Sequence, residues 1–159
     1  HHDMFGIQIS TPEQILFEEC EILAPCALGA LVNDQTIGKL KTKVIAGGAN
    51  NVLAEPRHGN QLKELGILYA PDYVINAGGL MNVFVELEGY SPDRAFDKTR
   101  KVYDNCLKVF EIAKKENIGT HTAADRMAEE RIKTIGQLKQ RHQGKSSRNF
   151  TTLKEVTNR

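Results

Sequence analysis

Short apolar runs that end at proline or glycine alternate with longer amphipathic stretches over the first half of the chain. Four of these runs are candidate strands, at residues 21–24, 44–46, 67–69 and 73–75. Pro25 stops the first run and Gly47-Gly48 stops the second, which is typical of strands buried in a parallel sheet. Helical patterns lie between them. The sequence therefore predicts an α/β fold with a parallel sheet covered by helices.

The helical segments carry recognisable start and stop signals. Thr11-Pro12 predicts the start of a short helix that runs to Phe17. The Thr11 hydroxyl can cap free N–H groups, and proline is tolerated in a first turn because the N–H that it lacks has no helical partner there. Asn33-Asp34 can cap a helix between the first two strands. Residues 55–65 predict another helix, which ends at Gly66.

Three longer helices are predicted after Leu80, over residues 82–87, over residues 92–116 and from Thr122 onward. The middle one is amphipathic. Its apolar positions are Ala95, Tyr103, Cys106, Val109, Phe110 and Ile112, and its charged positions are Asp93, Arg94, Lys98, Arg100 and Lys101.

These patterns divide the chain into an α/β part at residues 1–80, helices that pack on it at 81–144, and a tail at 145–159. The tail is rich in Lys, Arg, Ser, Thr and Asn, so we expect it to be frayed or held by a partner subunit. The opening His1-His2-Asp3 is either a tag remnant or an internal start.

Composition narrows the class of protein. With 159 residues, 40% hydrophobic and 26% charged, the chain is expected to be one soluble globular domain. A net charge of +1 gives no argument for nucleic-acid binding, and no apolar run approaches the roughly 20 residues of a membrane span. The three cysteines are an odd number at wide spacing, so we expect reduced, mostly buried thiols in a cytoplasmic protein.

Three segments place small or amide side chains directly after an apolar run, at residues 25–29, 47–51 and 76–79. Ligands bind at the carboxyl ends of strands in parallel α/β sheets. Small side chains allow close approach to the backbone, and asparagine offers a donor and an acceptor to ribose hydroxyls or a carboxamide. Any one segment could be only a turn, but together they favour a nucleotide and a polar substrate. The sequence has no GxGxxG turn.

Longer stretches carry a family resemblance. Residues 20–30 read CEILAPCALGA, residues 43–51 KVIAGGANN, residues 69–79 YAPDYVINAGG and residues 123–132 AADRMAEERI. Over about residues 20–135 the chain resembles the glutamate/leucine/phenylalanine/valine dehydrogenases, the leucine enzymes above all. The resemblance implies the second half of a Rossmann-like NAD-binding domain followed by C-terminal helices. It also implies reversible oxidative deamination of an L-amino acid to a 2-oxo acid and ammonia, with hydride passed to NAD.

The resemblance also assigns ligand contacts. Cofactor contacts fall on Cys26 and Ala27 beside the ribose, on Ala49, Asn50 and Asn51 at the nicotinamide end, and on Asn76 near the carboxamide. Substrate contacts fall on Asn51, Leu80 and Val83. Branched aliphatic residues at the last two positions favour a leucine-like substrate. Since Leu80 stands where the family commonly has valine, the pocket is expected to shift weakly toward valine or isoleucine.

No catalytic residue is predicted within this chain. In the family, two lysines and an aspartate of an N-terminal domain do the chemistry, and none of those motifs occurs here. Lys39, Lys41 and Lys43 are expected to be solvated, His58 to be structural or at the surface, and Cys26 to pack without reacting.

Two interpretations stay open. The chain is one part of a homo-oligomeric branched-chain amino-acid dehydrogenase that needs its N-terminal catalytic domain, or it is a truncated, non-catalytic assembly module. Half a sheet leaves an uncovered strand face in either case, so we expect the chain alone to self-associate.

Overall fold

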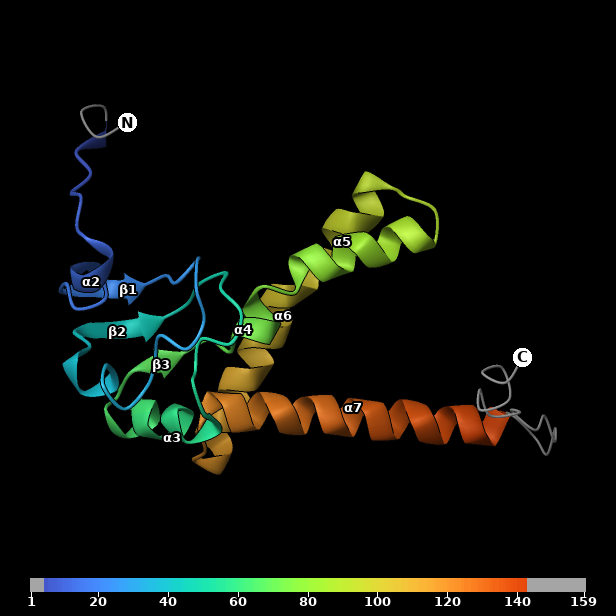
Figure 1. The fold of residues 1–159 in the computed structure, drawn as a ribbon. Helices are drawn as coiled ribbons and strands as arrows, with labels where there is room; N and C mark the ends of the chain where they lie inside the picture. The colour runs from blue at the N-terminus through green and yellow to red at the C-terminus, as the bar shows by residue number, and fades with distance from the viewer. Residues whose placement is uncertain (1–4, 143–159) are drawn as a thin grey trace, which may run out of the picture. The chain divides into compact units, whose positions relative to one another are not determined.

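The computed structural model describes residues 5–142, which include a three-stranded parallel sheet (Figure 1). The strands are β1 (Cys20–Leu23), β2 (Thr42–Ile45) and β3 (Leu68–Tyr69), in the order β1-β2-β3. Ile22 pairs with Val44, and Val44 pairs with Leu68. The prediction of a parallel sheet with flanking helices is confirmed.

Six helices and one 3-10 turn accompany the sheet in the described residues. They are α2 (Pro12–Ile15), η1 (Ile37–Lys39), α3 (Pro56–Glu64), α4 (Asp72–Ile75), α5 (Gly78–Leu87), α6 (Pro92–Glu116) and α7 (Thr120–His142). One compact unit ends at Met127 and a second begins at Ala128, so the boundary falls inside α7. None of these helices combines the length and the hydropathy of a membrane span. The tail predicted at 145–159 lies outside the described residues.

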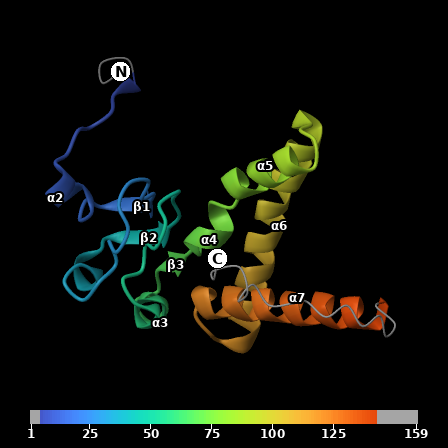
Figure 2. The same cartoon turned by 45° about the vertical axis from the view of Figure 1, so that its right-hand side comes forward.

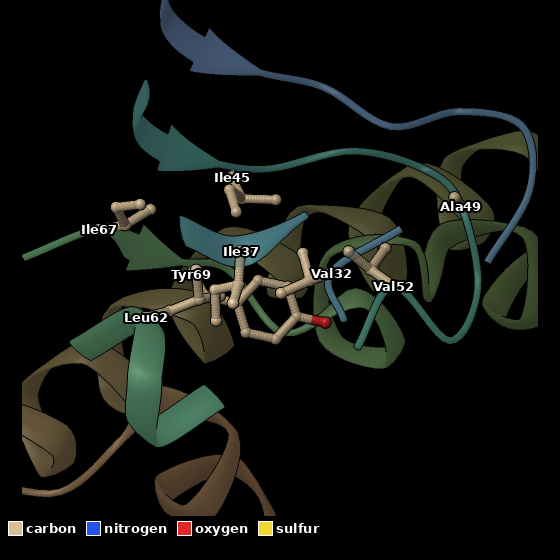
Figure 3. Packing of buried hydrophobic residues seen from close by; sticks show 8 residues of the cluster. All are labelled: Val32, Ile37, Ile45, Ala49, Val52, Leu62, Ile67 and Tyr69. Carbon is tan, nitrogen blue, oxygen red and sulfur yellow. The ribbon is translucent and has the colours of Figure 1, made fainter. Parts of the chain in front are cut away.

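One hydrophobic cluster forms where α3 covers the sheet. Leu62 of α3 and Ile45 of β2 are both fully buried. The other members come from β3, from η1 and from the loops around the strands (Figure 3): Val32, Ile37, Ala49, Val52, Ile67 and Tyr69. Leu23, Ile45 and Tyr69 are the strand residues on this face, because side chains alternate along each strand. Their burial holds the three strands at fixed positions relative to α3.

The opposite face of the sheet carries an exposed apolar row. Ile22, Val44 and Leu68 lie side by side in register. Ile22 is 62% exposed and Leu68 is 42% exposed, whereas Val44 is half-buried. An uncovered strand face of this kind was expected of half a sheet.

A second cluster joins α4, α6 and the start of α7. Val74, Val109, Ala113, Ala123 and Ala124 are buried in it. Both views place α5 alongside α6 (Figure 2). The predicted amphipathic pattern of α6 is confirmed at Ala95 and Val109, which are buried, but Tyr103 is 68% exposed and does not belong to the apolar face.

Two predicted elements are wrong. Residues 73–75 were expected to form a strand, but Val74 and Ile75 donate backbone hydrogen bonds to the Pro71 carbonyl and close a helical turn, α4. The expected helix after Asn33 is only the 3-10 turn η1, although Asn33 Oδ1 does accept from the backbone of Thr36. Gly38 at the centre of η1 is a poor helix former, and the chain is extended again at Leu40.

The exposed row predicts self-association of the 159-residue chain. The substitution Ile22→Thr keeps a β-branched residue in the edge strand and removes apolar surface, so sedimentation velocity should show less association than in the wild type. The free energy of unfolding should change by less than about 0.5 kcal/mol. Ile45→Thr, on the buried face, should instead cost about 2 kcal/mol. A wild-type chain that sediments as a monomer at all concentrations would contradict this prediction.

Candidate functional site

The loops that follow β1 and β2 lie against each other at the carboxyl edge of the sheet. Ala49 N donates to Pro25 O at 2.9 Å, and Ala30 N donates to Asn51 O at 2.6 Å. Farther along, Val32 N donates to Val52 O at 3.0 Å. These three bonds join the first two candidate ligand segments into one layer of backbone.

Two glycines make this approach of backbones possible. A Cβ atom at Gly47 would lie 2.1 Å from the Pro25 carbonyl oxygen, and one at Gly29 would lie 2.6 Å from the Asn50 carbonyl oxygen. Both clashes are with backbone atoms, which cannot turn aside as a flexible side chain could. Glycine is therefore required at both positions for a steric reason, not for its backbone freedom.

Asn51 is an exposed polar residue of this layer. Its φ of +54° is left-handed, a conformation that asparagine tolerates better than most residues. Within the described residues its side-chain amide makes no hydrogen bond, and the backbone N–H groups of Asn50 and Asn51 also have no acceptor. These groups are available to a ligand.

The third segment meets the second through an amide pair. Asn76 Nδ2 donates to Asn50 Oδ1 at 2.6 Å. Both side chains line a cavity of about 420 Å³, together with Gly48, Tyr73, Ala77 and Leu80. Val83 lies one turn beyond Leu80 on α5 and is half-exposed. The structure thus brings Asn50, Asn76 and Leu80, all predicted site residues, to one cavity.

Tyr73 is a cavity residue that the sequence analysis did not identify. Its hydroxyl donates to Asp125 Oδ1 at 2.6 Å. Burial and this bond to Asp125 raise the pKa of Tyr73 above its ordinary value, so the phenol stays protonated at neutral pH. The missed signal was Pro71-Asp72, a proline and an acid at the start of a helical turn, which turns Tyr73 toward the site.

A second, smaller cavity of about 230 Å³ also borders Tyr73 and includes Asn51, His121 and Asp125 in its lining. Burial lowers the pKa of His121, with Asp125 opposing the shift, which favours the neutral imidazole. Asn51 therefore borders one cavity while Asn50 borders the other.

The remaining predicted contacts occupy different environments. Cys26 is exposed, not buried as expected for the cysteines, and Cys20 and Cys106 are half-buried. The Cys26 sulfur accepts from Gly48 N at 3.5 Å, which places it beside the site loop. Ala27 is also exposed. Ala49 is 4% exposed and belongs to the first hydrophobic cluster, so only its backbone faces the loop surface.

The lysines lie at the other end of the sheet. Lys39, Lys41 and Lys43 are exposed, as expected, and Lys43 pairs with Glu21 at 2.9 Å. Lys41 and Lys43 border a hollow of about 890 Å³ near the amino ends of the strands. Since ligands of parallel sheets bind at the carboxyl ends, we assign this hollow no ligand.

His58 has the structural role that was expected. It is 1% exposed, and its Nδ1 accepts from the backbone N of Glu55 at 3.0 Å at the start of α3. Nδ1 is thus unprotonated, and Nε2 carries the hydrogen that faces Asp34 Oδ1 at 3.2 Å. Both ring nitrogens are used in holding α3.

Known proteins resemble this chain closely. The sequence profile of the Glutamate/Leucine/Phenylalanine/Valine dehydrogenase family matches residues 3–139. Leucine dehydrogenase of Geobacillus stearothermophilus is 60% identical over 131 residues, which is 82% of this chain and 36% of that enzyme. The chain therefore spans about a third of the length of the curated relatives that it matches.

Solved structures agree on the fold. L-tryptophan dehydrogenase from Nostoc punctiforme superposes with a TM-score of 0.81 at 44% identity, over 86% of this chain and 42% of that one. A hetero-hexameric glutamate dehydrogenase from Thermus thermophilus superposes at 0.66 and 20% identity, over 87% of this chain and 35% of that one, a likeness of fold alone. The sheet and helices are the second half of a Rossmann-like α/β fold, as the sequence predicted.

The contact between the site loops gives a direct test. Gly47→Ala forces a methyl group into the Pro25 backbone, so it should lower the free energy of unfolding by about 1–3 kcal/mol. Gly38→Ala is the matched control, because a Cβ there meets nothing within 4 Å, and it should be neutral or slightly stabilising. Equal stabilities of the two variants in urea titrations would mean that the loops do not touch.

Proposed function

Because the chain belongs to the glutamate/leucine/phenylalanine/valine dehydrogenase family, we propose that it binds NAD and substrate for the reversible oxidative deamination of a branched-chain L-amino acid. The products are a 2-oxo acid and ammonia. The observation that carries the proposal is the meeting of Asn50 and Asn76 at one cavity at the carboxyl edge of the sheet. The 60% identity to a leucine dehydrogenase supports a leucine-like substrate.

The residues at this edge fit a nicotinamide cofactor. Cys26 and Ala27 would lie beside the ribose, and Asn76 near the carboxamide, where its amide side chain can both donate and accept. The backbone N–H groups of Asn50 and Asn51, which have no acceptor among residues 5–142, suit the same ligand, and so does the absence of a side chain at Gly48 on the cavity wall. NAD, when bound, accepts the hydride that leaves the α-carbon of the amino acid.

The substrate would lie near Asn51, which borders the smaller cavity, and near α5, whose Leu80 borders the larger one. The carboxamide of Asn51 has no partner in the described part of the chain, so it can orient the polar end of the amino acid. Leu80 is 75% exposed and Val83 lies on the same side of the helix, which together offer an aliphatic wall. A wall of this kind favours leucine, valine or isoleucine over a large aromatic side chain.

In this proposal, a lysine outside this chain carries out the proton transfer. Lys39, Lys41 and Lys43 are exposed at the other end of the sheet, and His58 is used in capping α3. An N-terminal catalytic domain would supply two lysines and an aspartate, and the cytoplasmic enzyme would be a homo-oligomer. The part played by this chain is to hold NAD, fix the substrate and shape the pocket.

The substrate preference can be measured on the complete enzyme that carries this chain, by following NADH formation. We expect kcat/KM for leucine, valine and isoleucine to exceed that for phenylalanine. Leu80→Val enlarges the pocket by one methylene, so the leucine-to-valine ratio of kcat/KM should rise several-fold, and by no more than roughly 200-fold.

Leu87→Val is the matched control for this experiment. Leu87 lies two turns farther along α5 and is 82% exposed, so the same substitution there should leave the ratio unchanged. If no L-amino acid supports NAD reduction, the proposal is wrong, and the truncated, non-catalytic assembly module becomes the better interpretation.

A further inference from the structure

A single buried carboxylate ties the Asn50-Asn51 loop to α4. Asp72 is 7% exposed, and its Oδ2 accepts from Val52 N at 2.7 Å. Its Oδ1 accepts from Tyr73 N at 2.6 Å. Val52 directly follows Asn51, so the carboxylate holds the peptide group that connects the two residues.

This tie acts on the strained part of the loop. Asn51 is left-handed, and a conformation of that kind persists in a non-glycine residue only when its surroundings hold it. The peptide group after Asn51 is held at both ends. Its carbonyl accepts from Ala30 N at 2.6 Å, and its N–H, on Val52, donates to Asp72. Removing either bond frees rotation at the residue whose side chain faces the ligand.

The chemistry of the site requires a carboxylate. Asp72 is surrounded by two N–H donors, and an ionised carboxyl is the side chain that offers two acceptors and no donor. An amide at this position would set its NH₂ group against one of the two N–H groups. Hydrogen bonds to a charged group are also the stronger kind. One of these two bonds, from Val52 N, holds the loop, and the other, from Tyr73 N, lies within α4.

Asp72 also sets the distance between the two asparagine segments. It begins α4, and the same short helix is followed by Asn76, whose side chain donates to Asn50. The loop and α4 are therefore joined at both ends of the helix, by Val52 to Asp72 and by Asn76 to Asn50. The relative placement of the amide groups depends on both contacts.

We propose that Asp72 is a positioning residue for the proposed reaction: through Val52 N–H it fixes the left-handed turn at Asn51, and so orients the Asn50 and Asn51 amide groups toward nicotinamide and substrate. The inference rests on the proposed function. In that function Asp72 contacts neither NAD nor the amino-acid substrate.

The test uses Asp72→Asn and Asp72→Ser in the complete enzyme. Asparagine keeps the shape of the side chain and breaks one of the two bonds, and serine is too short to reach Val52. Since the bonds that close α4 are between backbone groups, both variants should fold. We expect the KM for NAD, and the Kd for NADH measured by fluorescence, to rise about tenfold in each. Hydrogen exchange at the Val52 amide should become faster without any ligand present.

Asp34→Asn is the control, because Asp34 also ties a loop to a helix through Arg57 and His58 but lies outside the site. It should lower the melting temperature and leave KM and Kd unchanged. Partial unfolding reduces kcat per mole of chain without changing KM, so the split between KM and kcat separates positioning from a purely structural role.

The outcomes are distinct. If the wild-type enzyme fails to bind NADH, the proposed function is wrong, whatever Asp72 does. If the wild type is active and both Asp72 variants keep KM and Kd within twofold, the positioning role is wrong. Failure of both variants to fold would also overturn it, because Asp72 would then serve the whole fold and not the loop.

Discussion

The contact between the loops that follow β1 and β2 is the constraint on which the site depends. Gly47 lies against the Pro25 backbone and Gly29 against the Asn50 backbone, closer than any side chain allows. Because these contacts join main-chain atoms, they fix where Asn50 and Asn51 stand relative to Cys26 and Ala27. A rigid scaffold with short loops at one edge of a sheet is the usual way in which α/β folds hold a nucleotide.

The helical turn α4, which follows β3, also holds the loop after β2. Asp72 and Asn76, at the two ends of α4, each bond to the loop after β2. The loop carries the exposed amide groups, whereas the buried carboxylate and the hydrophobic cluster beneath α3 hold it from behind. The exposed amide groups and the buried groups behind them form the surface at which we propose that NAD binds.

The sequence was sufficient for the elements with a strong local pattern. The strands 20–23 and 42–45 overlap the apolar runs predicted at 21–24 and 44–46 and end two residues before Pro25 and Gly47, and α6 covers the predicted residues 92–116. The same kind of reasoning failed at residues 73–75, where an apolar run of three is compatible with a strand or with a helical turn. There Val74 fills the cluster under α6, so tertiary packing decided the element. The loss of Tyr73 from the predicted site followed from that error.

The sequence by itself determined the α/β class, the family resemblance and the residue types at the carboxyl edge, because each depends on local order along the chain. Only the tertiary structure decided that Asn50 and Asn76 meet, that Ala49 turns into the core, and that Asp72 is buried beneath Asn51. Contacts between residues about 20 or more positions apart depend on how strands pair and helices pack. The periodicity of a single segment does not encode them.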